Sequence, residues 1–370
     1  MKRAVSFILA TLCIFSLFSC SKKEPEPSDE IPSVVTEPAT LPPENTEPTE
    51  PTEPAPTVPP LPVENYKTTE INISFVGDCL LGNEFGSSSA GTYNAAVLEK
   101  GQEFAFAGVK HIFEEDDLTV ADCEGVFTDN KYAPIQKEED PGYWYYAPAV
   151  NASAFKLGGV DIAGTANNHT GDYGAAGLAD TISAIEDAGV LAANDLEPVY
   201  VQIKGFTVGV LACNCWGSFH ASRIIDKISE MNEKSDIQVI FPHGGNMLQY
   251  YPEEWKKQAY RSFIDAGADI VAGDHPHVLQ PIETYGDGVI IYSLGNFIYG
   301  GKTGKEKESV IFRAKVIMHD DEIYRIEHEA IPCYMYNTER NSFTPYIIPP
   351  TDEAYDNIIS FLYGKRDYPF

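Results

Sequence analysis

Short apolar segments of strand length alternate with amphipathic helical stretches through most of this chain, and this alternation limits the fold more than any other feature. The segments predicted as strands are residues 71–77, 118–122, 160–164, 199–203, 207–213, 237–242, 270–273 and 289–294. Helices are predicted near residues 94–99, 149–157, 177–188, 253–266 and 352–363, and a hairpin over 309–318 and 322–334. Strands separated by helices are typical of parallel β-α units. The sequence therefore predicts an α/β domain, mostly parallel, with hairpins in its second half.

Polar side chains of the kinds that bind metals follow most of these predicted strands. They are Asp78, Asp122 and Glu124, the group Asn167, Asn168, His169 and Asp172, then His243, the group Asp274, His275 and His277, and finally Asn296. Because the carboxyl ends of parallel strands meet at one edge of a sheet, we expect these side chains to converge. Carboxylates and imidazoles suit Mn, Zn or Fe, and this many donors can hold two ions.

Each of these residues also has a structural explanation when it is taken alone. Asp78 can cap a helix or turn, Glu124 before Gly125 can belong to a turn, and Asn168 with His169 can form a hydrogen-bonded turn. Two imidazoles that flank Pro276 at a strand end have fewer structural uses. The metal site is therefore inferred from the whole set on one predicted edge.

The first 69 residues differ in composition from the rest. Residues 1–19 have a basic start and an apolar stretch too short to cross a bilayer, which predicts an export signal. Cys20 follows Leu-Phe-Ser, as in a bacterial lipobox, so we expect lipidation at Cys20; the alternative is a plain signal peptide cut nearby. Residues 20–69 are rich in Pro, Glu and Thr and predict a disordered tether. Residues 70–350 then form the folded domain, and 351–370 a C-terminal helix and tail.

Net charge restricts the classes of partner that the domain can bind, and the cysteine pattern restricts its redox chemistry. From Ile71 onward the chain has 44 acidic and 21 basic residues, a net charge of −23, which argues against nucleic acid as a partner. Five cysteines lie in the domain without a C-x-x-C pair, which is neither a disulfide framework nor a zinc-finger pattern. We expect them to be buried thiols. A disulfide between Cys79 and Cys123 is the alternative.

Six motifs occur in order along the domain: F-V-G-D, D-C-E-G, A-N-N-H-T-G-D-Y-G, H-G-G, A-G-A-D-I-V-A-G-D-H-P-H-V-L-Q-P and Y-S-L-G-N-F-I. With these motifs the chain resembles the CapA family of poly-γ-glutamate capsule synthesis proteins, whose domain is similar to calcineurin-like metallophosphoesterases. The resemblance covers residues 71–299, and the hairpin to about residue 350 completes it. It implies a four-layered α/β/β/α sandwich of metallophosphoesterase type with a two-metal centre at the strand edge.

The resemblance also implies roles for individual residues. The metal-shell residues would be Asp78, Glu124, Asn168, His243, His275 and His277. His169 would be the general acid, and Asn167, Asp172, Asp274 and Asn296 would be supporting or substrate-binding groups. The family commonly has His-Trp-Gly-x-Glu and Gly-His-His-Pro-His; here Gly244 replaces the Trp, Met247 replaces the Glu, and Asp274 replaces the first His.

Two functions remain open on this basis. The first is a membrane-tethered, metal-dependent hydrolase or transferase that acts outside the cytoplasm on a phosphoester or an anionic capsule polymer of the poly-γ-glutamate type. The second is a non-catalytic assembly factor that binds such a polymer through metal, with other capsule synthase subunits as partners. A third candidate, an exported solute-binding lipoprotein, explains the tether but not the His and Asn residues.

Overall fold

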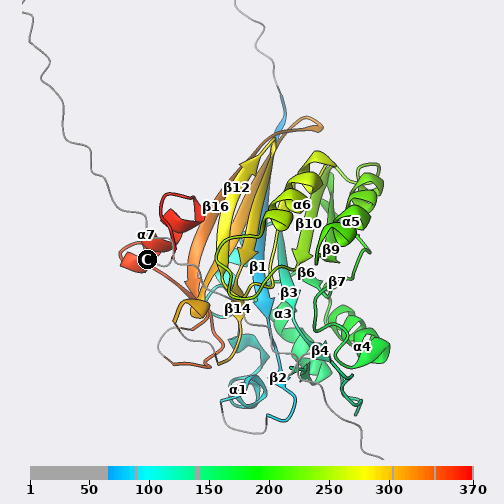
Figure 1. The fold of residues 1–370 in the computed structure, drawn as a ribbon, viewed down its shortest axis with the longest axis vertical. Coiled ribbons are helices and arrows are strands. Elements are labelled where there is room, and N and C mark those ends of the chain that lie inside the picture. The colour runs from blue at the N-terminus through cyan, green and yellow to red at the C-terminus, as the bar shows by residue number, and fades with distance from the viewer. Residues whose placement is uncertain (1–65, 88–90, 138–141, 302–303, 337–338, 369–370) are drawn as a thin grey trace, which may run out of the picture. The chain divides into compact units, whose positions relative to one another are not determined.

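A computed structural model describes residues 66–87, 91–137, 142–301, 304–336 and 339–368. Figure 1 shows two β-sheets that pack face to face, with helices on their outer sides. The predicted export signal, Cys20 and all of the predicted tether before residue 66 lie outside the described residues.

The first sheet is built around the long N-terminal strand β1. Its strand order is β17-β16-β15-β1-β3-β6-β7, and the short β14 pairs with the end of β1. β1 runs parallel to β3 and antiparallel to β15. The bounds are β1 Thr68–Cys79, β3 Leu118–Cys123, β6 Ile162–Gly164, β7 Leu191–Ala193, β14 Asn296–Ile298, β15 Glu308–His319, β16 Glu322–Tyr334 and β17 Tyr346–Ile347.

The second sheet has the order β12-β13-β11-β10-β9-β8. Its four central strands are parallel, and β8 and β12 flank them in antiparallel pairs. The bounds are β8 Val199–Ile203, β9 Phe206–Asn214, β10 Ile237–His243, β11 Ile270–Ala272, β12 Leu279–Tyr285 and β13 Gly288–Leu294.

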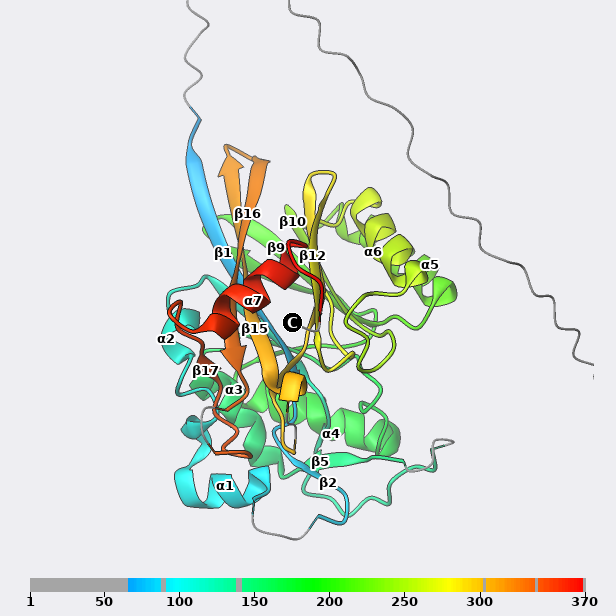
Figure 2. The ribbon, with the colours of Figure 1, turned by 60° about the vertical axis from the view of Figure 1, so that its left-hand side comes forward.

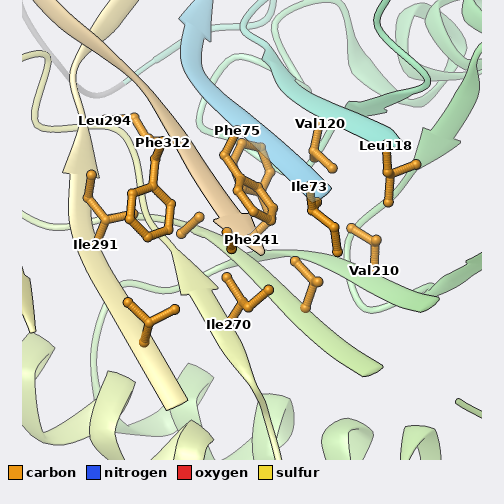
Figure 3. Close-up of a cluster of buried hydrophobic side chains, with 14 of the residues drawn as sticks. Ile73, Phe75, Leu118, Val120, Val210, Phe241, Ile270, Ile291, Leu294 and Phe312 are labelled. Carbon is orange, nitrogen blue, oxygen red and sulfur yellow. The ribbon is translucent and has the colours of Figure 1, made fainter. Parts of the chain in front are cut away.

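A continuous apolar core fills the space between the sheets (Figure 3). Phe75 of β1 lies at its centre, with its ring centroid 6.4 Å from that of Phe241 in β10 and 6.2 Å from that of Phe312 in β15. These β-strands are buried on both faces, which explains their nearly unbroken apolar sequences.

Helices cover the outer faces of both sheets. Buried side chains of α1, α2, α3 and α4 pack on the first sheet, and those of α5 and α6 pack on the second. The result is a four-layered α/β/β/α sandwich, as expected for the metallophosphoesterase type. The helix bounds are α1 Tyr93–Lys100, α2 Lys110–Phe113, α3 Ser153–Gly158, α4 Gly174–Asp187, α5 Ser218–Met231 and α6 Glu254–Asp265.

Two smaller elements complete the domain. A three-stranded sheet of the order β2-β5-β4 lies beyond the end of β1, with bounds β2 Asn83–Glu84, β4 Val126–Phe127 and β5 Tyr145–Ala147. The C-terminal helix α7, Glu353–Leu362, packs against β12 and β16 (Figure 2). Within the described ranges, no helix has the length and hydropathy needed to span a bilayer.

Every predicted strand is present, and so is the hairpin, whose turn is Asp320 and Asp321. The predicted helix at 149–157 is a 3-10 turn, Ala149–Ala152, followed by α3. Helix α5 and strand β12 were not predicted. All five cysteines of the domain are buried and free, and Cys79 and Cys123 are register partners in β1 and β3.

The two-sheet core predicts a large penalty for truncating Phe75. Phe75→Ala should lower the free energy of unfolding by about 3–5 kcal/mol, because the rigid sheets cannot close the cavity. Urea unfolding followed by tryptophan fluorescence would measure this. Leu98→Ala on α1, where Leu98 is 90% exposed, is the control and should change stability by less than about 0.5 kcal/mol. Equal stabilities of the two variants would contradict this packing.

Candidate metal centre

The carboxyl ends of strands from both sheets meet at one side of the sandwich. Asp78 and Asp122 are register partners at the ends of β1 and β3. His243, the last residue of β10, forms a parallel bridge with Asp274, just after β11. Gly77 allows the close approach at this point, because a Cβ there would lie 2.1 Å from the carbonyl oxygen of Gly295.

Two groups of side chains have ligand atoms close enough to share an ion. The first is Asp78, Asp122, His243 and Asp274, and the second is Asp78, Glu124 and His277; in each group the ligand atoms lie within 4.8 Å of one another. All these side chains are buried. Asp78 belongs to both groups, so its carboxylate would contribute to holding a cation in either of them.

The chemistry of this cluster fits bound cations. Both carboxylate oxygens of Glu124 and Oδ2 of Asp122 are buried without a hydrogen-bond partner among the described residues. Burial raises the pKa of Asp122 and of Glu124 well above the ordinary values; for Asp122 the charges of Asp274 and Asp78 add to the effect. Buried, clustered carboxylates of this kind are costly unless cations neutralise them. The donor set therefore suits divalent metal ions.

The histidine rings of the site contact one another and the acidic cluster. His277 Nδ1 lies 2.8 Å from Asp78 Oδ2, and His243 Nδ1 lies 2.7 Å from Asp274 Oδ1. His243 Nε2 lies 2.8 Å from Asn168 Oδ1 and 3.0 Å from His275 Nδ1. Burial lowers the pKa of His243 to about 4, so this ring is neutral near pH 7, as a metal ligand must be.

Backbone strain is concentrated in the turn that carries two of these histidines. His275 has φ of 87° and His277 has φ of 59°, both in the left-handed region that non-glycine residues rarely adopt. Strained conformations persist where the surrounding structure enforces them, and they cluster at functional sites. The turn directs the His277 ring to Asp78 and the His275 ring to His243, and the backbone amide of His275 donates to Asp78 Oδ1 at 3.4 Å.

His169 lies beside the metal donors rather than among them. Its Nε2 is 3.7 Å from Glu124 Oε1, while its Nδ1 is 2.9 Å from Asp172 Oδ2. Lys137 pairs with the other oxygen of that carboxylate at 2.5 Å. Burial lowers the pKa of His169, and the carboxylate of Asp172 opposes this shift. This arrangement fixes the ring orientation and leaves Nε2 facing the centre.

Two asparagines hold ligand side chains in place. Asn167 Nδ2 donates to Asp122 Oδ1 at 3.1 Å and to the carbonyl of Cys123 at 2.8 Å. Asn296 Oδ1 lies 3.0 Å from His277 Nδ1, and its amide nitrogen donates to the carbonyl of His277 at 3.0 Å. Such outer contacts set the direction of a metal ligand.

A fully buried lysine lies behind the cluster. Lys256 of α6 donates to the carbonyl of Gly244 at 2.8 Å and to Gln280 Oε1 at 3.3 Å. Burial lowers the pKa of Lys256 to about 8, while the charges of Glu253 and Asp274 act in the opposite direction. Lys256 thus places a cation near the acidic cluster independently of any metal.

The two donor groups contain four of the predicted ligands, Asp78, Glu124, His243 and His277, and two further carboxylates. Asp122 and Asp274 belong to the donor group of Asp78 and His243. Asp122 was not predicted as a ligand, and Asp274 was predicted as a supporting or substrate-binding residue. Asn168 Oδ1 and His275 Nδ1 both lie against His243 Nε2, so these two predicted ligands also lie at the centre. The position of Asp122 at the end of a predicted strand was the sequence feature that could have identified it as a ligand. Lys137 and Lys256 had no signal in the sequence.

Comparison with known proteins gives the family. Residues 72–300, more than half of the chain, match the family model described as bacterial capsule synthesis protein PGA_cap. The chain is similar to the PGA biosynthesis protein CapA of Bacillus subtilis (strain 168), with 28% identity over 73% of this chain and 75% of that protein. It is 26% identical to the capsule biosynthesis protein CapA of Bacillus anthracis, over 68% of this chain and 65% of that protein.

Among solved structures, a hypothetical protein from Thermus thermophilus aligns with 71% of this chain and 99% of its own, at 13% identity and a TM-score of 0.44. The family match spans every strand-end residue described above, from Asp78 to Asn296. The resemblance drawn from the six motifs is confirmed: the chain belongs to the bacterial capsule synthesis protein family PGA_cap, the CapA family.

Proposed function

We propose that this protein is an extracytoplasmic, metal-dependent hydrolase or transferase that acts on a capsule-type polymer at the cell surface. The observation that carries the proposal is the shared carboxylate of Asp78, which joins two buried donor groups beside an oriented histidine. Family membership supports the capsule context, since two relatives are named for capsule or PGA biosynthesis. The bond attacked would be a phosphoester or an amide.

The residues of the site have distinct tasks in this proposal. Asp78, Asp122, His243 and Asp274 would hold one ion, and Asp78, Glu124 and His277 a second. Bound there, divalent cations would supply Lewis acidity to the reacting oxygens. His169 would carry the proton through Nε2, because Nδ1 is engaged by Asp172. Asn167 would keep the Asp122 carboxylate directed at the centre.

The location of the reaction is part of the same proposal. Residues 1–19 would direct export, and lipid on Cys20 would anchor the chain to the membrane. The Pro-, Glu- and Thr-rich segment would then give the domain reach from the membrane surface. Other capsule synthase subunits would be its partners there.

Metal binding should depend on Asp78. Elemental analysis should find divalent metal in the purified wild-type protein, and Asp78→Asn should lose it, because both donor groups share this carboxylate. A chelator should lower the unfolding midpoint of wild type but not of Asp78→Asn, since bound metal at 100 times its Kd stabilises by about 2.7 kcal/mol. Asp187→Asn, an exposed change on α4, is the control and should behave like wild type. Unchanged metal content in Asp78→Asn would refute the centre.

Proton transfer should depend on His169. With a chromogenic phosphodiester and poly-γ-glutamate as a substrate panel, His169→Asn should lower kcat by about 10²–10⁴-fold while metal content stays unchanged. His111→Asn, which alters an exposed histidine, should keep full activity. If wild type and His169→Asn are both inactive but both bind the polymer, the protein is instead an assembly factor without turnover.

A further inference from the structure

Lys256 is a charged side chain behind the metal donors to which the proposed reaction gives no task. It belongs to the first turn of α6, and its side chain is completely buried. Lysine is almost never buried to this extent unless other charges compensate it. A cation in the first turn also opposes the helix dipole. Both costs indicate that the charge of Lys256 has a role in the charges around it.

The fold fixes the position of this ammonium group beside a metal donor. Its Nζ donates to the carbonyl of Gly244, the residue after His243, at 2.8 Å and to Oε1 of Gln280 at 3.3 Å. The amide nitrogen of Gln280 donates to the carbonyl of Gln249 at 2.7 Å, which keeps Oε1 directed to the lysine. Gly245 leaves the necessary space, because its φ is 112° and a Cβ there would lie 3.1 Å from Nζ. Both hydrogen-bond acceptors are uncharged, so they orient the ammonium group without neutralising it.

The charge of Lys256 acts on the donor group that contains Asp274. Burial and the charge of Asp78 raise the pKa of Asp274, and Lys256 acts in the opposite direction. Burial lowers the pKa of the lysine itself to about 8, and the charges of Glu253, Asp274 and Asp78 oppose this shift. The amine is therefore mostly protonated at pH 7. Lysine and carboxylates thus stabilise one another in their charged forms.

A fixed cation at this place has opposite effects on the metal-free and the metal-bound protein. The donor group consists of Asp78, Asp122, His243 and Asp274, so it brings three buried carboxylates together. In metal-free protein a cation nearby reduces their repulsion, which favours the fold. A divalent ion would add two positive charges close to the one that Lys256 already supplies, and like charges repel strongly in a buried site. Lys256 therefore favours the metal-free state over the metal-bound state.

We propose that Lys256 sets the metal affinity of the donor group that contains Asp274: its charge stabilises this group in metal-free protein and weakens the binding of a divalent ion there. This inference rests on the proposed function, because it concerns the metal centre of the same site. Lys256 acts through its charge and not as a ligand. The domain then keeps its fold when metal dissociates.

Calorimetric titration of metal-free, full-length protein with Mn²⁺ and, separately, with Zn²⁺ at pH 7 tests the inference. Lys256→Gln removes the charge and keeps a hydrogen-bond donor, so its affinity should rise about tenfold or more. The two ions should gain by similar factors, because a charge effect does not depend on ligand preference, whereas altered ligand geometry would affect them differently. A chelator should also lower the unfolding midpoint of Lys256→Gln more than that of wild type. Lys257→Gln is the matched control on the same helix: Lys257 is partly exposed, 3.8 Å from Glu254 Oε2, and its loss should leave both affinities unchanged.

The outcomes separate this inference from the proposed function. If wild type binds metal and Lys256→Gln binds it equally or more weakly, the role of Lys256 is wrong and the metal centre stands. If only Lys256→Gln binds metal, the role of Lys256 is supported and the metal dependence of wild type is wrong. Absence of binding in both proteins contradicts the centre and this inference together.

A folding defect in the variant is also informative. Lys256→Gln that is unfolded without metal and folds when Mn²⁺ is added supports the inference. If it is unfolded in both conditions, the double variant Lys256→Gln/Asp274→Asn, which removes one charge of each sign, should restore the fold. A double variant that remains unfolded contradicts the coupling between these two residues.

Discussion

The mutual repulsion of buried carboxylates is the constraint on which the site depends. Asp78, Asp122, Glu124 and Asp274 lie where strands of two sheets end, and all four are almost completely buried. Burial and the neighbouring charges raise the pKa of Asp122 and Asp274, so these groups resist carrying charge unless cations are near. Apolar side chains of similar volume at these positions would give equal or greater stability. Lys256 supplies part of the positive charge that such a cluster needs, and divalent cations held by the two donor groups would supply more.

The core between the sheets keeps this costly cluster in place. Phe75 and Phe241 pack the strands β1 and β10 that end in Asp78 and His243. Both strands are buried on both faces, so neither can shift register without moving a whole apolar set out of the core. The sandwich therefore holds donors from distant parts of the sequence at fixed separations, and the strained backbone at His275 and His277 completes the set.

The sequence predicted those parts of the site that follow from strand ends. Parallel strands converge whatever their detailed packing, so Asp78, His243 and His277 could be placed together from pattern alone. Residues of the site that do not lie at the end of a strand were not predicted. Lys137 reaches Asp172 from a loop, Lys256 comes from the face of α6, and their positions depend on tertiary packing that a local pattern does not encode. The helix α5 was missed as well, although its buried residues recur at helical spacing.

The departures from the family motifs fall in two different places, and the physical consequences differ. Asp274, in the position of a family histidine, lies in the buried cluster, where it adds negative charge that Lys256 partly offsets. Met247, in the position of a family glutamate, is 59% exposed and lines the same pocket as His275 and His277. A methionine at this position leaves both groups of buried carboxylates and imidazoles unchanged and makes the pocket wall less acidic and more apolar. The first change alters the charge of the buried cluster, and the second alters the polarity of the pocket wall beside it.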